Sequence, residues 1–211
     1  MRLKQYLVIM VKAPRIGFVK SRLASEIGLV SAWTFYRRNM ADVAKRLNAD
    51  RRWETILATT PQNSTRYQRI WPIKGLRLNQ GSGDIGNRMK KIMKILPPGP
   101  IVIIGSDIPN ISLRHINNAF KSLGHSDIVF GPSYDGGYWL VGLRRRPKLI
   151  EIFDKVNWVS QNTLSETIAT LPKKLKINVI ETLVDVDDLN SLMFLKQIEA
   201  KTLNKFQKVT L

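Results

Sequence analysis

Asp107 closes a short stretch in which a wholly apolar run, Ile101–Ile104, is followed by Gly105 and Ser106. Four consecutive apolar residues cannot alternate between a buried and an exposed face, so the run predicts a strand that is covered on both sides. In sheets of such strands, ligands bind at the carboxyl ends. A carboxylate there is suited to a divalent cation, which prefers oxygen ligands. Capping of a helix that begins near Ser112 is the alternative role, and the sequence leaves both open.

Three more carboxylates, Asp185, Asp187 and Asp188, fall within four positions near the end of the sequence. Like charges this close repel one another unless a cation or a helix N-terminus offsets them. Asp188 is explained as the cap of the helix that follows. Asp185 and Asp187 occupy alternate positions of an extended stretch, and capping does not explain both.

Cations are concentrated in the loop after a second apolar run, Leu7–Val11. At the carboxyl end of a first strand, lysines and arginines together indicate a cradle for phosphates. The loop has the spacing of neither a P-loop nor a Rossmann fingerprint. A solvated basic loop is the alternative. The residues concerned are Lys12, Arg15, Lys20 and Arg22, with Pro14 and Gly17 between them.

Two further aspartates stand beside glycines. Asp84 is a good N-cap for the helix that follows it, and Gly81 and Gly83 leave room for a ligand near the helix N-terminus. Asp135, followed by two glycines, either lies in the turn of a hairpin or follows a strand that leaves the core, as Asp107 does.

Hydrophobic periodicity predicts strands that alternate with helices around these residues. This alternation is typical of a mostly parallel sheet with helices on both faces. Further strands are predicted at residues 54–59, 76–78, 127–131, 138–143 and 177–180, and helices from Ser31, after Asp84, from Ser112, at 148–155, at 162–171 and after Asp188.

The composition limits the class of protein. No linker-like stretch divides the 211 residues, so we expect one domain over residues 1–211. Cysteine is absent, which excludes disulfides and thiolate metal sites. The first apolar run is too short for a signal peptide or a membrane span, so we expect a cytoplasmic protein. His115 and His125 have no partner in ligand spacing, and we expect both at the surface.

The net charge is +18, from 34 Lys and Arg against 16 Asp and Glu. Such an excess favours a polyanionic partner: nucleic acid, a membrane surface or phosphorylated small molecules. The cations are dispersed and form no basic stripe interleaved with aromatic residues, which single-strand binders use. A nucleic-acid-binding protein is therefore the disfavoured alternative, and it would bind with a steep dependence on salt.

Six motifs occur together and in one order. They are Lys12-Ala-Pro-x2-Gly-x-Val-Lys-Ser-Arg-Leu23, Gly83-Asp-x-Gly-x-Arg-Met89, Gly105-x-Asp-x-Pro109, Asp135-Gly-Gly-Tyr-x-Leu-x-Gly142, Trp158 with Thr167 downstream, and Asp185-Val-Asp187. This ordered set resembles the bacterial DUF2064 proteins, the radical-SAM/selenodomain-associated transferase group of the nucleotide-diphospho-sugar transferase superfamily. That group is similar to the guanylyltransferases that activate phospholactate-type acids. The resemblance covers about residues 6–195.

The resemblance implies an α/β fold, a Rossmann-like α/β/α sandwich with a mostly parallel central sheet (GT-A), and a divalent metal, Mg²⁺ or Mn²⁺. Asp107 and Asp135 would be catalytic. The metal would lie at Asp107 and at either Asp185 or Asp187, of which we prefer Asp187. The implied nucleotide-binding residues are Lys12, Ala13, Pro14, Arg15, Gly17, Lys20, Arg22, Gly83, Asp84 and Arg88, and the implied acceptor-binding residues are Asp135, Gly136, Gly137 and Tyr138.

The chain departs from the family pattern at three places. Ile16 stands where a proline is usual, Ser21 replaces the common threonine, and the Thr-Pro-Glu-Asp run is missing after Asp187. We expect a metal-dependent, glycosyltransferase-like enzyme that uses a nucleotide or nucleotide sugar and a small-molecule acceptor. A guanylyltransferase-like nucleotidyltransferase with a phosphorylated or carboxylate acceptor is the alternative; a basic nucleic-acid-binding protein is the second.

Overall fold

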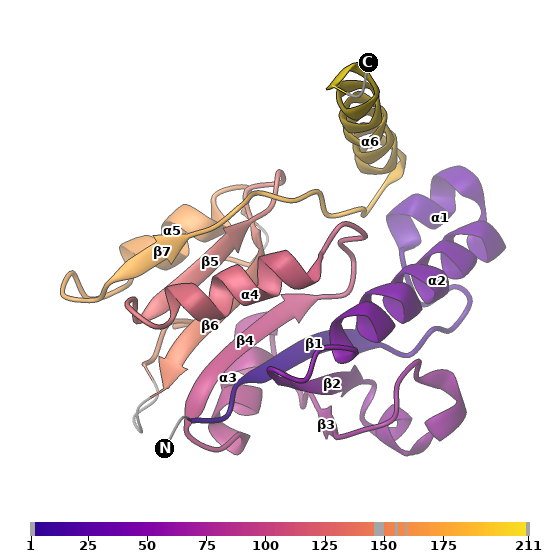
Figure 1. The fold of residues 1–211 in the computed structure, drawn as a ribbon. Helices are drawn as coiled ribbons and strands as arrows, with labels where there is room; N and C mark the ends of the chain where they lie inside the picture. Colours follow the sequence, from indigo (N-terminus) through magenta and orange to yellow (C-terminus); the bar gives the residue numbers. More distant parts are fainter. Residues whose placement is uncertain (1–2, 146–149, 155, 159, 210–211) are drawn as a thin grey trace.

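The computed structural model describes residues 3–145, 150–154, 156–158 and 160–209 (Figure 1). Within these residues, seven strands form one sheet. They are β1 (Tyr6–Lys12), β2 (Glu54–Thr60), β3 (Arg77–Asn79), β4 (Gly99–Gly105), β5 (Ile128–Pro132), β6 (Tyr138–Arg145) and β7 (Ile177–Val179). Their order is β3-β2-β1-β4-β6-β5-β7. Strand β6 is antiparallel to β4 and β5, and the other neighbouring strands are parallel.

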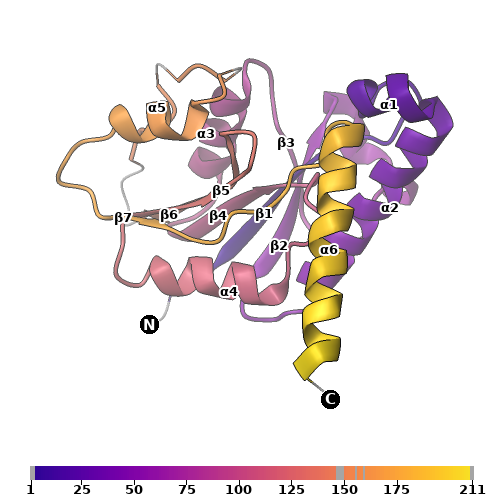
Figure 2. The same ribbon diagram turned by 90° about the horizontal axis from the view of Figure 1, so that it is seen from above.

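Helices cover both faces of the sheet, so the predicted α/β/α sandwich is confirmed. They are α1 (Ser21–Ile27), α2 (Leu29–Asn48), α3 (Ile85–Ile95), α4 (Leu113–Ser122), α5 (Thr163–Ala169) and α6 (Leu189–Val209), with two short 3-10 helices at Gln62–Arg66 and Gln68–Ile70. Helices α2 and α4 pack on one face, and α3 and α5 pack on the other (Figure 2). No helix among the described residues combines the length and the hydrophobicity that a membrane span needs.

Strand β1 shows why the apolar runs in the sequence are continuous. It lies inside the sheet between β2 and β4. Leu7 and Ile9 are buried against α2, whereas Val8 and Met10 are buried towards α3. Because each face of the strand is covered, both sets of alternating side chains must be apolar, and each fully buried one contributes roughly 1.5–3 kcal/mol.

The antiparallel strand β6 brings a second loop to the edge where β4 ends. Gly105 ends β4, and Tyr138 begins β6 at the same edge. A turn closed by the hydrogen bond from Ser133 N to Gly137 O, at 3.0 Å, joins β5 to β6. Asp135 therefore lies in a hairpin turn and also at the edge of the sheet where Asp107 stands.

The segment before α6 crosses the same edge and explains the position of the last aspartates. Leu183 N donates to Pro132 O at 3.0 Å, and Val186 N donates to Asp107 O at 3.1 Å. Asp188 then caps α6, as predicted, because its Oδ1 accepts a hydrogen bond of 2.8 Å from Ser191 N. Beyond this cap α6 projects from the body of the molecule (Figure 1).

Two expectations need correction. His115 is buried rather than at the surface, because its Nδ1 accepts from Ser112 N at 3.1 Å in a capping box and its Nε2 lies 2.8 Å from Glu181 Oε2. The helix expected at 148–155 is absent from residues 150–154, where Ile152 and Phe153 hold an irregular segment on the core. Residues 148, 149 and 155 lie outside the described part.

Candidate functional site

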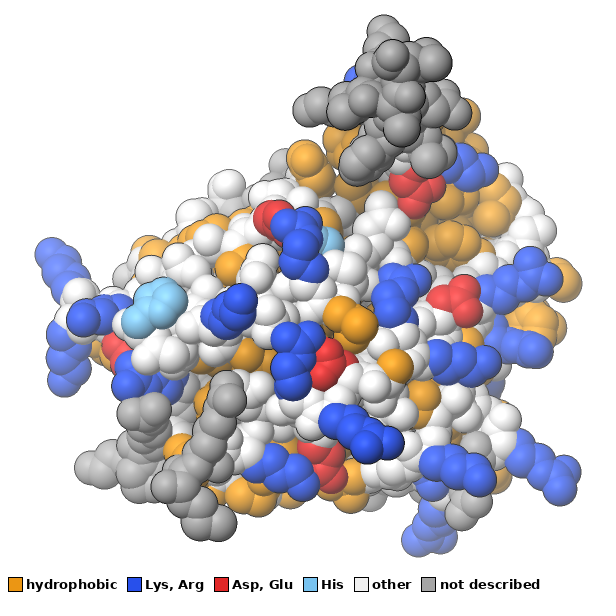
Figure 3. Space-filling view, viewed as in Figure 1, with side chains coloured by type: hydrophobic (Ala, Val, Ile, Leu, Met, Phe, Trp, Pro, Cys, Tyr) orange, Lys and Arg blue, Asp and Glu red, His pale blue; other side chains and the backbone are white. Residues whose placement is uncertain are grey.

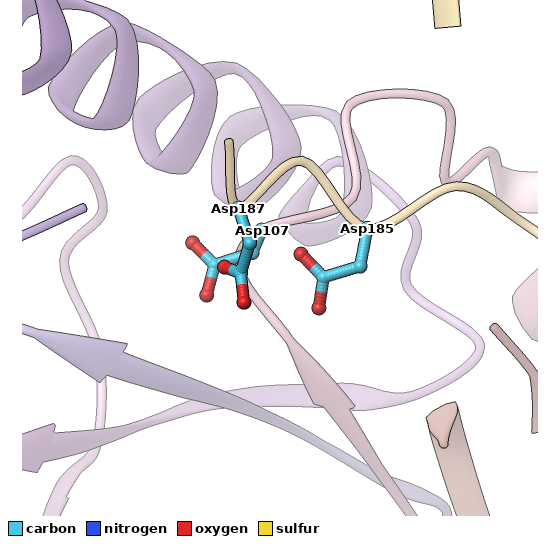
Figure 4. Close-up of side chains that lie close together, drawn as sticks. All are labelled: Asp107, Asp185 and Asp187. Carbon is cyan, nitrogen blue, oxygen red and sulfur yellow. The ribbon is translucent and has the colours of Figure 1, made fainter. Parts of the chain in front are cut away.

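Three aspartates meet at the edge of the sheet where β4 ends and β6 begins (Figure 4). Asp107 follows β4, and Asp185 and Asp187 lie in the segment before α6. One carboxylate oxygen of each lies within 4.8 Å of the other two. The structure thus brings both candidates for the second ligand position to Asp107. Asp107 does not cap α4, whose N-cap is Ser112.

Lys20 lies among these three carboxylates. Its Nζ is 2.7 Å from Asp187 Oδ1, 3.0 Å from Asp107 Oδ1 and 3.7 Å from an oxygen of Asp185, and only 5% of its side chain is exposed. Burial by itself would lower the pKa of Lys20, but the three carboxylates together raise the pKa above its ordinary value. The ammonium group is therefore charged at neutral pH.

Negative charge remains in excess around Lys20. Arg22 lies 2.9 Å from Asp187 Oδ2, but its side chain is largely exposed and such pairs stabilise little. Burial of the carboxyl group raises the pKa of Asp185 to about 7; Lys20 opposes this shift, and Asp107, Asp187 and Asp135 add to it. The group of three acids is thus held together against its own repulsion.

These residues fit a divalent metal ion. Asp107 Oδ1 and Asp185 Oδ1 are buried and accept no hydrogen bond from the described residues; Lys20 approaches them as an ion pair without hydrogen-bond geometry. Three carboxylates, two of them with an unsatisfied buried oxygen, form the hard donor set that Mg²⁺ and Mn²⁺ prefer. Asp107, Asp185 and Asp187 would hold the ion, and their negative charge would be offset by both the ion and Lys20.

The raised pKa of Asp185 makes the stability of the metal-free protein depend on pH. Between about pH 4 and pH 7 the folded state holds a proton on Asp185 that the unfolded state has released, so the free energy of unfolding falls as the pH rises. Asp185→Asn removes this titration. In EDTA we expect the melting temperature of Asp185→Asn, relative to wild type, to increase from pH 4.5 to pH 8. If the difference in melting temperature between Asp185→Asn and wild type does not change with pH, the pKa of Asp185 is not raised.

Two cavities meet at the aspartates. The smaller, about 380 Å³, is lined by Lys12, Lys20 and Arg22 together with Asp107 and Asp187. The larger, about 980 Å³, is lined by residues 133–141, Asp185 and residues of the segment 158–163. Lys12 and Lys20 of the implied nucleotide-binding residues thus line a different cavity from the implied acceptor-binding residues at 135–138. Met10, Arg22, Ile85 and Gly105 line both.

Several implied nucleotide-binding residues line neither cavity in the part of the chain that the structure describes. They are Ala13, Pro14, Arg15, Gly17, Gly83, Asp84 and Arg88. Asp84 caps α3, because its Oδ1 accepts from Asn87 N at 2.7 Å, and Arg88 Nε donates to Gly83 O at 3.0 Å. Trp33 Nε1 donates to Pro14 O at 2.9 Å and fixes the basic loop. These side chains shape the backbone around the site.

Three polar residues that the sequence analysis missed fix the strand ends at the smaller cavity. Tyr36 Oη donates to Lys12 O and accepts from Lys12 N, both at 2.8 Å. Gln80 Nε2 donates to Val11 O and Ala58 O, near the ends of β1 and β2, and Asn39 Nδ2 donates to Ser106 O at 2.7 Å. Burial, helped by Asp107, raises the pKa of Tyr36, which keeps its hydroxyl protonated. Tyr36 and Asn39 could have been found as polar side chains on the buried face of α2, whereas no sequence pattern indicated Gln80.

The hairpin turn packs tightly against the segment at Gln161, which also lines the larger cavity. Gly136 has a φ of +86°, and Leu164 N donates to its carbonyl at 3.1 Å. A Cβ on Gly136 would lie 1.6 Å from the backbone oxygen of Gln161. Only glycine therefore allows this close approach of turn and loop.

Gly136→Ala is expected to destabilise the protein more than the same change at Gly28. Gly28 has a φ of +88°, but a Cβ there would meet no atom within 4 Å. Gly28→Ala should cost about 1–3 kcal/mol from the positive-φ extended backbone alone, and Gly136→Ala should cost at least about 1 kcal/mol more because backbone must move. Urea unfolding of both variants measures the difference; equal losses would show that the turn and the loop are not held together.

Comparison with known proteins places the chain in a family. The sequence profile of DUF2064, described as uncharacterized protein conserved in bacteria, matches residues 43–160, over half of the chain. The chain belongs to the DUF2064 family. The resemblance inferred from the six motifs is thus confirmed. No curated protein matches this DUF2064 chain significantly.

Solved structures share the fold of this DUF2064 protein. A protein of Desulfovibrio desulfuricans G20, assigned as a nucleotide-diphospho-sugar transferase, has a TM-score of 0.79 and 26% identity over 87% of this chain and 82% of that one. The 4-diphosphocytidyl-2C-methyl-D-erythritol synthase of Anaerococcus prevotii DSM 20548 has a TM-score of 0.61 and 10% identity, covering 93% and 98%. Rv0371c of Mycobacterium tuberculosis H37Rv, in complex with manganese, has a TM-score of 0.53 and 14% identity, covering 92% and 98%. The last two show the fold alone.

Proposed function

We propose that this DUF2064 protein is a metal-dependent transferase that uses a nucleotide-linked donor, with glycosyl transfer as the leading reaction. The observation that carries the proposal is the position of the three aspartates, at the junction of a small cavity in which basic residues outnumber acidic ones and a larger cavity in which acidic residues outnumber basic ones. Such a junction can hold the diphosphate of a donor between nucleotide and transferred group. The similarity to an assigned nucleotide-diphospho-sugar transferase at 26% identity supports the sugar-nucleotide reading.

In such a transfer the aspartates and the lysines of the site would have different roles. A metal held by Asp107, Asp185 and Asp187 would supply Lewis-acid stabilisation of the diphosphate oxygens. Lys12 and Lys20 place positive charge in the smaller cavity, where charge develops on the leaving diphosphate. Because Asp107 and Asp187 fix the Lys20 ammonium before the substrate binds, this cation needs no reorganisation during the reaction.

Asp135 is placed to handle the acceptor. Its Oδ1 accepts from Ser133 Oγ at 2.5 Å and from Gly137 N at 3.0 Å, which fixes the carboxylate in the turn. In the proposed step the acceptor hydroxyl oxygen bonds to the sugar carbon, the bond from that carbon to the diphosphate breaks, and the nucleoside diphosphate leaves with the electron pair. Asp135 takes the hydroxyl proton.

The face of the molecule drawn in Figure 3 favours an enzyme over a nucleic-acid-binding protein. Figure 3 shows Lys and Arg side chains spread over one face and interspersed with acidic and apolar groups, not gathered into a continuous stripe. A protein that tracks a nucleic acid backbone needs such a stripe.

Melting of the purified protein with nucleoside triphosphates and nucleotide sugars, with and without Mg²⁺ or Mn²⁺, tests the proposal. A ligand at a hundred times its dissociation constant adds about 2.7 kcal/mol to the free energy of unfolding. We expect one nucleotide class to stabilise the wild type only with metal, and Asp107→Asn to lose this effect. The absence of any metal-dependent shift, in every combination, would refute the proposed function.

A further inference from the structure

The larger cavity has a charge opposite to that of the protein. Its acidic lining residues are Asp135, Asp185 and Asp188, and Arg22 is the one Lys or Arg among its described lining residues. The whole chain has 34 Lys and Arg against 16 Asp and Glu. A cavity chosen without regard to its function would be expected to carry more cations than anions, so this local excess of carboxylates requires an explanation.

Arg22 offsets these carboxylates only in part, because among the described residues its guanidinium forms no hydrogen bond with any of the three. It lies at the boundary between the cavities and lines both of them. Its guanidinium is paired with Asp187, on the side of the smaller cavity, at 2.9 Å. The charge of Arg22 thus lies on the side of the smaller cavity. Asp135, in the hairpin turn, has no cation as a hydrogen-bond partner among the described residues.

The charges of the donor site are already balanced without the acceptor. Lys12, Lys20 and Arg22 together with one divalent ion carry five positive charges. The three aspartates of the junction and a nucleotide-diphosphate donor, which has two negative charges, carry five negative ones. A phosphate or carboxylate on the acceptor would therefore meet Asp135 and Asp188 with no free cation to receive it.

The remaining walls of the larger cavity suit a hydroxyl-bearing molecule. Trp158 and Tyr138 are in edge contact, with ring centroids 6.2 Å apart, and both line the cavity. Ser160 and Gln161 bring hydroxyl and amide groups to the same wall. Flat apolar surfaces with a few polar groups are typical of sites that bind small polyhydroxylated ligands, and carboxylates accept hydrogen bonds from their hydroxyls.

We infer that the acceptor is an uncharged or positively charged, hydroxyl-bearing molecule, and that the larger cavity excludes phosphorylated and carboxylate acceptors. The inference rests on the proposed function and makes it more specific, because it separates glycosyl transfer to a neutral hydroxyl from nucleotidyl transfer to a phosphorylated acid.

Matched acceptors test the inference. The donor is the nucleotide sugar that gives the largest metal-dependent melting shift. The wild type is incubated with this donor and one acceptor from three neutral and anionic pairs: glucose and glucose 6-phosphate, glycerol and glycerol 3-phosphate, and methyl lactate and lactate. Mass spectrometry follows the products. We expect kcat/KM for the neutral member of each pair that reacts to exceed that of the anionic member by at least about tenfold, as one unfavourable charge contact predicts. Equal or higher kcat/KM for an anionic member would overturn the inference.

A variant pair tests the cause. Gln161→Lys adds one cation to the wall and keeps the backbone carbonyl that packs on Gly136, and Gln161→Met is the uncharged control of similar size. We expect Gln161→Lys, but not Gln161→Met, to improve relative activity towards the anionic members by about tenfold. No difference between the two variants would show that charge in this cavity does not set selectivity.

Fluorescence quenching gives an answer even if no acceptor of the panel reacts. The part of the emission due to Trp158 is the difference between wild type and Trp158→Phe. With Mg²⁺ and the stabilising nucleoside diphosphate bound, we expect caesium to quench this part more than iodide does, after normalising each to free tryptophan amide. Stronger quenching by iodide, as the net charge of +18 alone predicts, would overturn the inference. The metal-dependent melting shift with nucleotide is measured separately. If that shift is observed and the quenching result contradicts the inference, the proposed function still holds.

Discussion

Asp107→Asn is expected to reduce turnover at least about a hundredfold, the effect of removing one preorganised electrostatic group from a transfer site. Asparagine keeps the shape of the side chain but removes a charge from the cluster that would hold the metal. The fold should persist, because the backbone carbonyl of Asp107 still accepts from Val186 N and because loss of the charge relieves repulsion with Asp185 and Asp187. Steady-state kinetics with the nucleotide sugar that stabilises the wild type measures the effect.

Asp42→Asn is the matched control. Asp42 is exposed on α2 and lines none of the cavities at the aspartate junction, so the same chemical change there should leave kcat/KM unaltered. Metal titration followed by melting separates the cause: Asp107→Asn should show no metal-dependent shift, and Asp42→Asn should match the wild type. Full activity of Asp107→Asn with an intact fold would remove Asp107 from the mechanism.

Lys20→Met is expected to produce the largest loss of stability, about 3 kcal/mol in the free energy of unfolding without divalent metal. Breaking a buried ion pair by removing one partner typically costs 3–5 kcal/mol, and the partial exposure of the three aspartates places this case at the lower end. Lys20 Nζ is within 3.0 Å of two of them. Methionine keeps the length and apolar packing of the side chain, so the loss reports the charge. Urea unfolding in EDTA measures it.

Divalent metal should restore much of this loss. Without Lys20 the three carboxylates are free to bind the ion with all their charge, so Mn²⁺ should stabilise Lys20→Met more than it stabilises the wild type. Lys74→Met, at an exposed loop position, is the control and should change the free energy of unfolding by less than about 0.5 kcal/mol. An equal metal-dependent gain in wild type and Lys20→Met would show that Lys20 and the ion do not share the same carboxylates.

The effects expected for Asp107→Asn and Lys20→Met together describe a site whose arrangement lowers the stability of the fold and serves the proposed activity. Three acids converge although they repel, and one buried lysine offsets only part of their charge. Strained or repulsive groupings of this kind persist where the chemistry requires them, and substitutions that relieve them stabilise the protein at the expense of activity. The expected rise in the melting temperature of Asp185→Asn, relative to wild type, from pH 4.5 to pH 8 in EDTA follows the same reasoning.

Local apolar patterns were enough to predict the strands and the residues that follow them. The runs Leu7–Val11 and Ile101–Ile104 lie inside β1 and β4, with the basic loop and Asp107 directly after them. Asp84 and Asp188 cap helices as their positions predicted. These features depend on contacts between near neighbours and on whether a strand is covered on one face or two, which the order of apolar and polar residues records.

The tertiary structure alone decided which distant side chains meet. Lys20 and Asp187 are 167 positions apart, and nothing in their local sequence shows that the ammonium lies among three carboxylates. Asp185 joins the cluster because Leu183 and Val186 pair with Pro132 and Asp107 through backbone hydrogen bonds, which any residues could make. The sequence by itself determined the strands, the helix caps and the residue types at the strand ends. Long-range backbone pairing and burial, which have no local pattern, decided that those residues form two cavities of opposite charge around one group of acids.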